Sequence, residues 1–70
     1  MKERKLIRVN DVMTLTSLSR TRIWHLANND EEFPKPIKLS PRVACFVEEE
    51  VLEWIESQIQ KARSLEGVRH

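Results

Sequence analysis

Residues 12–24, with the sequence VMTLTSLSRTRIW, decide the fold of this 70-residue chain. The pattern predicts a short helix, a tight break at residues 17–19, and a second helix. The outward face of the second helix is expected to carry four polar side chains: Arg20, Thr21, Arg22 and His25. Two short helices that meet at a sharp corner, with a basic face on the second, are what the major groove of DNA accepts. The sequence therefore predicts a protein that binds duplex DNA.

Both helices carry start signals in the sequence. Asn10 is expected to cap the first helix, and Asp11 suits the positive helix end. Ser19 is expected to cap the second helix, and Leu18 is placed to pack against Ile23 as a hydrophobic staple. The first helix is too short to be stable alone, so packing must hold it.

Apolar residues at helical spacing predict the core. From the first helix, Val12 and Leu15 are expected to point inward or toward the edges of the core. Ile23, Leu26 and Ala27 form one stripe on the second helix. We interpret the aromatic residues and the single cysteine as core packing rather than as binding groups: Trp24, Phe33, Cys45, Phe46 and Trp54.

The middle of the chain predicts a basic β-hairpin. Two prolines exclude residues 33–36 from a helix interior. Strands are predicted at residues 37–39 and 43–47, joined by Ser40-Pro41-Arg42, which leaves Arg42 at or near the tip. A further short edge strand is predicted at residues 6–9.

The last helix is the clearest element. Its inward face is one stripe of six residues: Val51, Trp54, Ile55, Gln58, Ile59 and Ala62. Glutamates begin this helix and basic residues follow, which matches the helix macrodipole. Gly67 lies beyond the pattern, and the tail to His70 is expected to fray. The acidic run at residues 48–50 is interpreted as a helix start, with a protein-facing surface as the alternative.

Charge is distributed unevenly although the net charge is only +1. Nine basic and five acidic residues up to Phe46 give about +4, whereas three basic and six acidic residues from Val47 onward give about −3. Such asymmetry can turn a basic surface toward a polyanion, but ordinary surface charge explains it equally well.

Composition argues against other classes of function. With one cysteine, two histidines and one glycine, the chain offers neither a closed zinc site nor a phosphate-binding glycine loop. We therefore expect no enzyme, no metal and no cofactor. Cys45 has no partner for an internal disulfide, which fits a reduced cytoplasmic setting. The basic N-terminus lacks the apolar stretch of a secretion signal, and no run is long enough to span a bilayer.

Three strings in this order resemble the AlpA-like family of prophage and integrative-element regulators: LSRTRIW at 18–24, FPKPIKLSPR at 33–42 and EVLEWI at 50–55. The resemblance covers about residues 6–60. It implies a winged helix-turn-helix fold, mainly α with a small β-hairpin, similar to phage excisionases and to the DNA-binding part of MerR-type regulators. Ser17 and Ser40 stand where such proteins commonly have glycine in the turn and in the wing.

The resemblance implies a recognition helix in the major groove and a hairpin wing beside it. It places four residues on the recognition helix and three on the wing: Arg20, Thr21, Arg22 and His25, then Lys38, Ser40 and Arg42. Ser19 and Lys35 are further candidate DNA contacts. Because residues at i and i+2 do not share a helix face, Arg20 and Arg22 are expected to have different roles. Several readings stay open: His25 is as readily a surface residue as a ligand of DNA, Arg42 could be a solubilising turn residue, and the two lysines would neutralise backbone phosphate.

The sequence predicts one domain over residues 1–70, with an ordered part at about 5–64. It predicts a regulator of transcription, an excisionase-like directionality factor that binds and bends DNA, or both. Double-stranded DNA is the expected partner, with an integrase of the tyrosine recombinase type and further copies of the chain beside it. The alternative is a protein-interaction module that inhibits or recruits another regulator through its acidic last helix.

Overall fold

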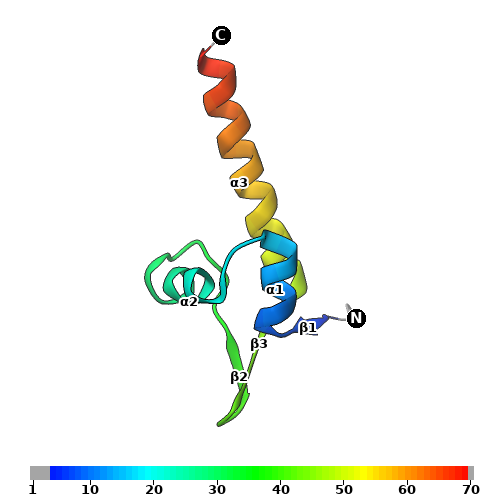
Figure 1. Ribbon diagram of the computed structural model, residues 1–70. Helices are drawn as coiled ribbons and strands as arrows, with labels where there is room; N and C mark the ends of the chain where they lie inside the picture. Colours follow the sequence, from blue (N-terminus) through cyan, green and yellow to red (C-terminus); the bar gives the residue numbers. More distant parts are fainter. Residues whose placement is uncertain (1–3, 70) are drawn as a thin grey trace.

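The computed structural model describes residues 4–69, with side chains for residues 4–64. The elements follow in the order β1 (Leu6–Ile7), α1 (Val9–Thr16), α2 (Arg20–Asn29), β2 (Ile37–Ser40), β3 (Val43–Val47) and α3 (Glu48–Arg69) (Figure 1). This is the mainly helical fold with a small hairpin that the sequence predicts. The predicted domain limits include residues 1–3 and 70, which lie outside the described part of the chain.

The first helix starts earlier than its sequence pattern predicts. Its N-cap is Arg8, not Asn10, because Val9 is already helical and does not extend β1. The Arg8 carbonyl accepts from the backbone N–H of Asp11 at 2.9 Å, and the Asp11 carboxylate accepts from the Arg8 N–H at 3.3 Å. Asp11 therefore satisfies a free backbone donor at the positive end of α1, the end at which the sequence places it. Asn10 lies in the first turn, where its side chain is available for another contact.

Ser17 makes the corner between α1 and α2. Its φ of 63° and ψ of 20° are left-handed, and its N–H donates to the carbonyl of Met13 at 2.8 Å. The hydroxyl of Thr16 donates to the Val12 carbonyl and accepts from the N–H of Leu18 at 3.2 Å. Leu18 packs against the core cluster that contains Ile23, as a hydrophobic staple requires. Side chains and backbone together therefore fix the sharp turn that the sequence predicts.

Replacement of Ser17 by glycine is expected to stabilise the fold. A non-glycine residue in the left-handed region is strained by about 1–2 kcal/mol, and glycine relieves this strain. Glycine also makes the unfolded state more favourable, because its chain is more flexible, and this offsets about half of the stabilisation. The expected net gain is about 0.5–1 kcal/mol, which raises the midpoint of thermal unfolding by about 2–8 °C in a domain of this size. Circular dichroism melts measure it. Ser17→Ala is the control, because it removes the hydroxyl but keeps Cβ, and it should bring no gain. A glycine variant that melts lower than the parent would contradict this account of the turn.

The strands form a three-stranded antiparallel sheet in the order β1-β3-β2. Ile7 pairs with Phe46 in β3, so the N-terminal segment is the edge strand that the sequence predicts, although it is shorter. In the hairpin, Lys38 pairs with Ala44 and Ser40 with Val43, which leaves an irregularity between Lys38 and Ser40. The turn consists of residues 41–42. Among the described residues only Ser17 has a positive φ, so neither Ser40 nor this turn adopts the left-handed conformation that favours glycine.

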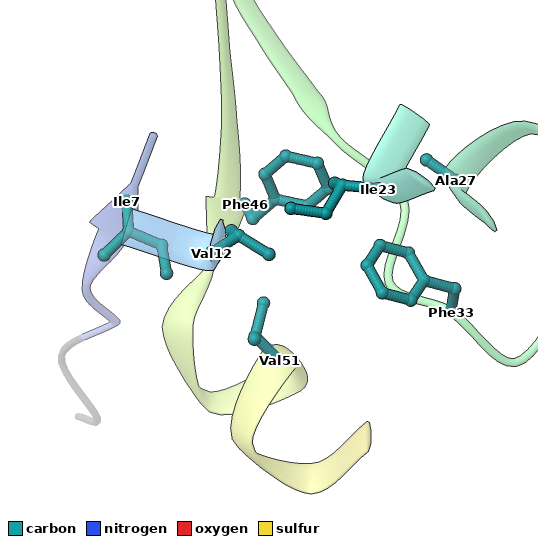
Figure 2. Close-up of a cluster of buried hydrophobic side chains, with 7 residues drawn as sticks. All are labelled: Ile7, Val12, Ile23, Ala27, Phe33, Phe46 and Val51. Carbon is teal, nitrogen blue, oxygen red and sulfur yellow. The ribbon is translucent and has the colours of Figure 1, made fainter. Parts of the chain in front are cut away.

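A small core holds these elements together. Seven buried residues form it, and Figure 2 shows their side chains converging from both short helices, the sheet and the start of α3: Ile7, Val12, Ile23, Ala27, Phe33, Phe46 and Val51. The ring centroids of Phe46 and Trp24 lie 5.6 Å apart, and those of Phe33 and Trp54 lie 4.8 Å apart. The predicted packing roles of the aromatic residues and of the buried Cys45 are confirmed.

Leu15 lies at the edge of the core and not inside it. It is 39% exposed, because α1 ends one residue later and nothing covers its C-terminal turn on that side. The hairpin projects from one end of the body and α3 from the opposite end (Figure 1). The backbone of α3 is helical through Gly67 to Arg69, beyond the ordered part predicted from the sequence, which ends near residue 64.

Candidate nucleic-acid interface

Helix α2 presents one face to the core and the other to solvent. Ser19 caps it: the hydroxyl accepts from the Arg22 N–H at 3.1 Å, as the sequence predicts. Ile23 and Ala27 are buried, and this fixes the rotation of the helix. The predicted recognition residues are all exposed: Ser19, Arg20, Thr21, Arg22 and His25.

The two arginines have different surroundings. The Arg20 Nη2 atom donates to the Asn10 Oδ1 atom at 2.6 Å, so this guanidinium joins the start of α2 to the first turn of α1. No hydrogen bond or ion pair of the Arg22 side chain is found among the described residues, and its guanidinium is open to solvent. The two arginines therefore differ in their contacts, and their roles on DNA stay a prediction. Asn10 is a residue that sequence reasoning had placed in a cap, and only the tertiary contact shows its link to Arg20.

The C-terminal end of α2 is closed by side chains. The Asn29 amide donates to the His25 carbonyl at 2.9 Å and lies 3.4 Å from the His25 Nδ1 atom. Lys35 reaches back from the following loop, and its ammonium donates to the carbonyls of Ala27 at 2.9 Å and Asp30 at 3.2 Å. A cation at the negative end of a helix satisfies free carbonyls there. Lys35 thus has a structural role that its place after Pro34 does not reveal in the sequence.

The wing, defined as the hairpin of β2 and β3, carries the remaining predicted residues. Lys38 and Ser40 lie on β2 and Arg42 lies in the turn at the tip, and all three are exposed. β2 has no buried residue, whereas β3 buries Cys45, Phe46 and Val47. β3 therefore anchors the wing to the body, and β2 is free to meet a partner.

One acidic side chain that follows α2, that of Glu32, points toward α3. Lys61 of α3 donates to the Glu32 carboxylate at 2.7 Å. This hydrogen bond and the charge of Glu32 raise the pKa of Lys61, so the ammonium remains protonated at a higher pH than a free lysine does. Any stability gained from this pair is present below the usual lysine pKa and is lost as the pH rises through the higher value of the folded state. The pair joins the segment after α2 to α3, which projects away from the wing (Figure 1).

The described residues offer no cluster of three or more His, Cys, Asp or Glu side chains suited to holding a metal ion. Over the same residues, no helix has the length and apolar character needed to cross a membrane.

A helix-turn-helix with a solvent-facing second helix and an adjacent hairpin wing defines a winged helix-turn-helix domain, a class of DNA-binding protein. The sequence pattern of the family described as "Prophage CP4-57 regulatory protein (AlpA)" matches residues 5–59. The chain belongs to this family of prophage regulators, and the resemblance seen in its sequence is confirmed. Neither the curated proteins nor the solved structures include a match to the chain.

Proposed function

We propose that the chain binds duplex DNA sequence-specifically, with α2 in the major groove and the wing on the adjacent minor groove or phosphates. One observation carries this proposal: α2 leaves the guanidinium of Arg22 exposed and without a partner among the described residues, and the same body carries a wing with Arg42 at its tip. Such a pair of basic projections matches the way winged domains contact DNA.

The contacts of each residue suggest its part in recognition. Arg22 is free to pair with guanine O6 and N7 or with a phosphate, because guanidinium matches both as a bidentate donor. Arg20 is held by Asn10, which fits a backbone contact that sets the position of α2. Thr21 and His25 can add hydrogen bonds along the groove. Lys38, Ser40 and Arg42 would act from the wing, and arginine is favoured in a narrow minor groove.

The size of the domain predicts modest affinity for a single copy. One module of this kind buries about 600–1,000 Å² on DNA. Specific control would then require several copies on adjacent sites, and bending of the DNA between them would add specificity through deformation energy. We therefore propose that the chain regulates transcription, acts as an excisionase-like directionality factor beside an integrase, or does both.

A salt titration tests the DNA interface. If about five basic groups neutralise phosphates, log K is expected to fall with log[salt] at a slope of about −4.5. Gel-shift assays with DNA from the ends of the host element, at several salt concentrations, measure this slope. A set of fragments that gives no salt-sensitive complex would contradict the proposal.

Footprinting on the same fragments separates the two regulatory roles. Repeated protected sites beside integrase sites, on DNA that is bent in the complex, favour a directionality factor. One site next to a promoter favours control of transcription.

A further inference from the structure

Helix α3 has an apolar face that its own chain covers only in part. Ile55 packs partly against the core, whereas Leu52 and Ile59 expose 45% and 37% of their surface. Beside the C-terminal turn of α1, this face opens into a groove of about 350 Å³. The groove is lined mostly by apolar side chains, together with one glutamine: Leu15, Leu18, Ile55, Ile59, Ala62 and Gln58. The exposure of Leu15, at the edge of the core, belongs to the same groove.

The first half of α3 is acidic and its second half is basic. Residues 48–56 contain five glutamates and no basic residue, whereas residues 57–69 contain three basic residues and one glutamate: Lys61, Arg63, Arg69 and Glu66. A second α3 laid antiparallel would place the acidic half of each helix against the basic half of the other. A parallel arrangement would place like charges together, which is unfavourable.

We propose that this groove is filled by α3 of a second copy of the chain, in an antiparallel, two-fold symmetric dimer. Leu52, Ile55, Ile59 and Ala62 are spaced by three, four and three residues, the spacing of a seam between paired helices. With the two-fold axis near Gln58, Ile55 of each copy meets Ile59 of the other. The Gln58 amide both donates and accepts, so it can pair with its own counterpart across the axis.

Two exposed charges fit the same register. Glu56 would lie beside Arg63 of the second copy, and symmetry repeats the pair on the other side. The Glu56 carboxylate accepts one bond from Gln60 at 3.2 Å, which leaves acceptor capacity for a guanidinium. No hydrogen bond or ion pair of Arg63 is found within the described part of the chain, so its guanidinium is available.

The dimer leaves the DNA-binding side free, because α3 projects from the end of the body opposite the wing (Figure 1). The paired segment of α3 is only about 15 Å long, so the interface falls in the small class below about 1,200 Å² and predicts a weak, micromolar dimer. Two-fold symmetry further predicts that a dimer on DNA reads inverted half-sites.

Sedimentation of the full chain without DNA tests the pairing. A concentration-dependent equilibrium between monomer and dimer is expected from about 10 μM to about 1 mM, the range in which so small an interface assembles. Ile59→Glu should raise the dimer Kd by at least about 10-fold, because it buries a charge in the seam. Ser64→Glu is the control: it adds the same charge at an exposed position of α3 away from the seam, and should leave the dimer unchanged. Melting curves of both variants show whether the fold is kept.

Charge reversal tests the antiparallel register. Glu56→Arg and Arg63→Glu should each weaken the dimer several-fold, and the double variant should restore it because the pair is formed again with its signs exchanged. In a parallel dimer these residues lie about 10 Å apart along the axis, and the double variant would restore nothing. A chain that stays monomeric throughout, a dimer that ignores Ile59→Glu, or a groove that takes a different protein instead would each overturn the proposal. Because DNA is absent from the experiment, failure of DNA binding and failure of the dimer are distinguished.

Discussion

A variant with both Arg20 and Arg22 replaced by alanine is expected to lose its sequence-specific complex with DNA while keeping its fold. The base contact proposed for Arg22 discriminates by about 1–3 kcal/mol, and the charged backbone contact proposed for Arg20 adds about 1.5 kcal/mol or more, so loss of both predicts an affinity decrease of at least about 30-fold. Both side chains are exposed, and neither fills the core. Gel shifts on specific and unrelated DNA, together with circular dichroism melts, measure the two expectations on the same protein.

Single variants assign the two arginines. Arg22→Ala should lower specific binding without changing the melting temperature, because no contact of its side chain within the described residues is lost. Asn10→Ala removes the partner of Arg20 but no positive charge, so a loss of affinity in this variant would identify Arg20 as a positioning residue. Lys61→Ala is the matched charge control, since it removes one positive charge from α3. If Arg22→Ala and Lys61→Ala bind equally well, α2 is not the recognition helix.

The features that the sequence predicts correctly are determined by near neighbours. Ser19 caps α2 through a bond to Arg22 three residues later, and Leu18 packs beside Ile23 at the staple position. The prolines around Phe33 exclude helix, and the alternating and helical spacings define the strands and α3. The exposed face of α2 follows from the same periodicity, because Ile23 and Ala27 fix which side is buried. Sequence alone was therefore sufficient for the order of elements and for the outer face of α2.

The features that it misses depend on contacts between distant residues. The bond of Arg20 to Asn10 spans ten residues, and that of Lys35 to the Ala27 carbonyl spans eight. Leu15 has the spacing of a core residue, but the groove beside α3 leaves it exposed. Periodicity gives the direction in which a side chain points, but whether another element lies there is a tertiary property. The same holds for the left-handed Ser17, whose conformation is forced by the corner that it closes.

The core predicts the largest effect on stability. Phe46 is fully buried, and its ring contacts those of Trp24 at 5.6 Å and Phe33 at 6.3 Å. Phe46→Ala is expected to destabilise the fold by about 3–5 kcal/mol, through lost burial and the cavity left between these rings. A 70-residue domain is stable by only about 4–10 kcal/mol, so this single change should leave much of the protein unfolded at physiological temperature.

Thermal melts with tryptophan fluorescence measure this effect, because Trp24 contacts Phe46 directly and Trp54 contacts Phe33. Phe46→Leu keeps most of the buried volume and should cost much less, whereas Leu39→Ala, at a site that is 56% exposed on the wing, should change stability by less than about 0.5 kcal/mol. Phe46→Ala should also reduce DNA binding, in proportion to the fraction of protein that is unfolded. Cooling refolds the protein and should restore binding. Arg22→Ala should lose binding at every temperature. A Phe46→Ala protein that melts within a few degrees of the parent would show that the hairpin is not anchored through this ring, and the placement of the wing beside α2 would then need another cause.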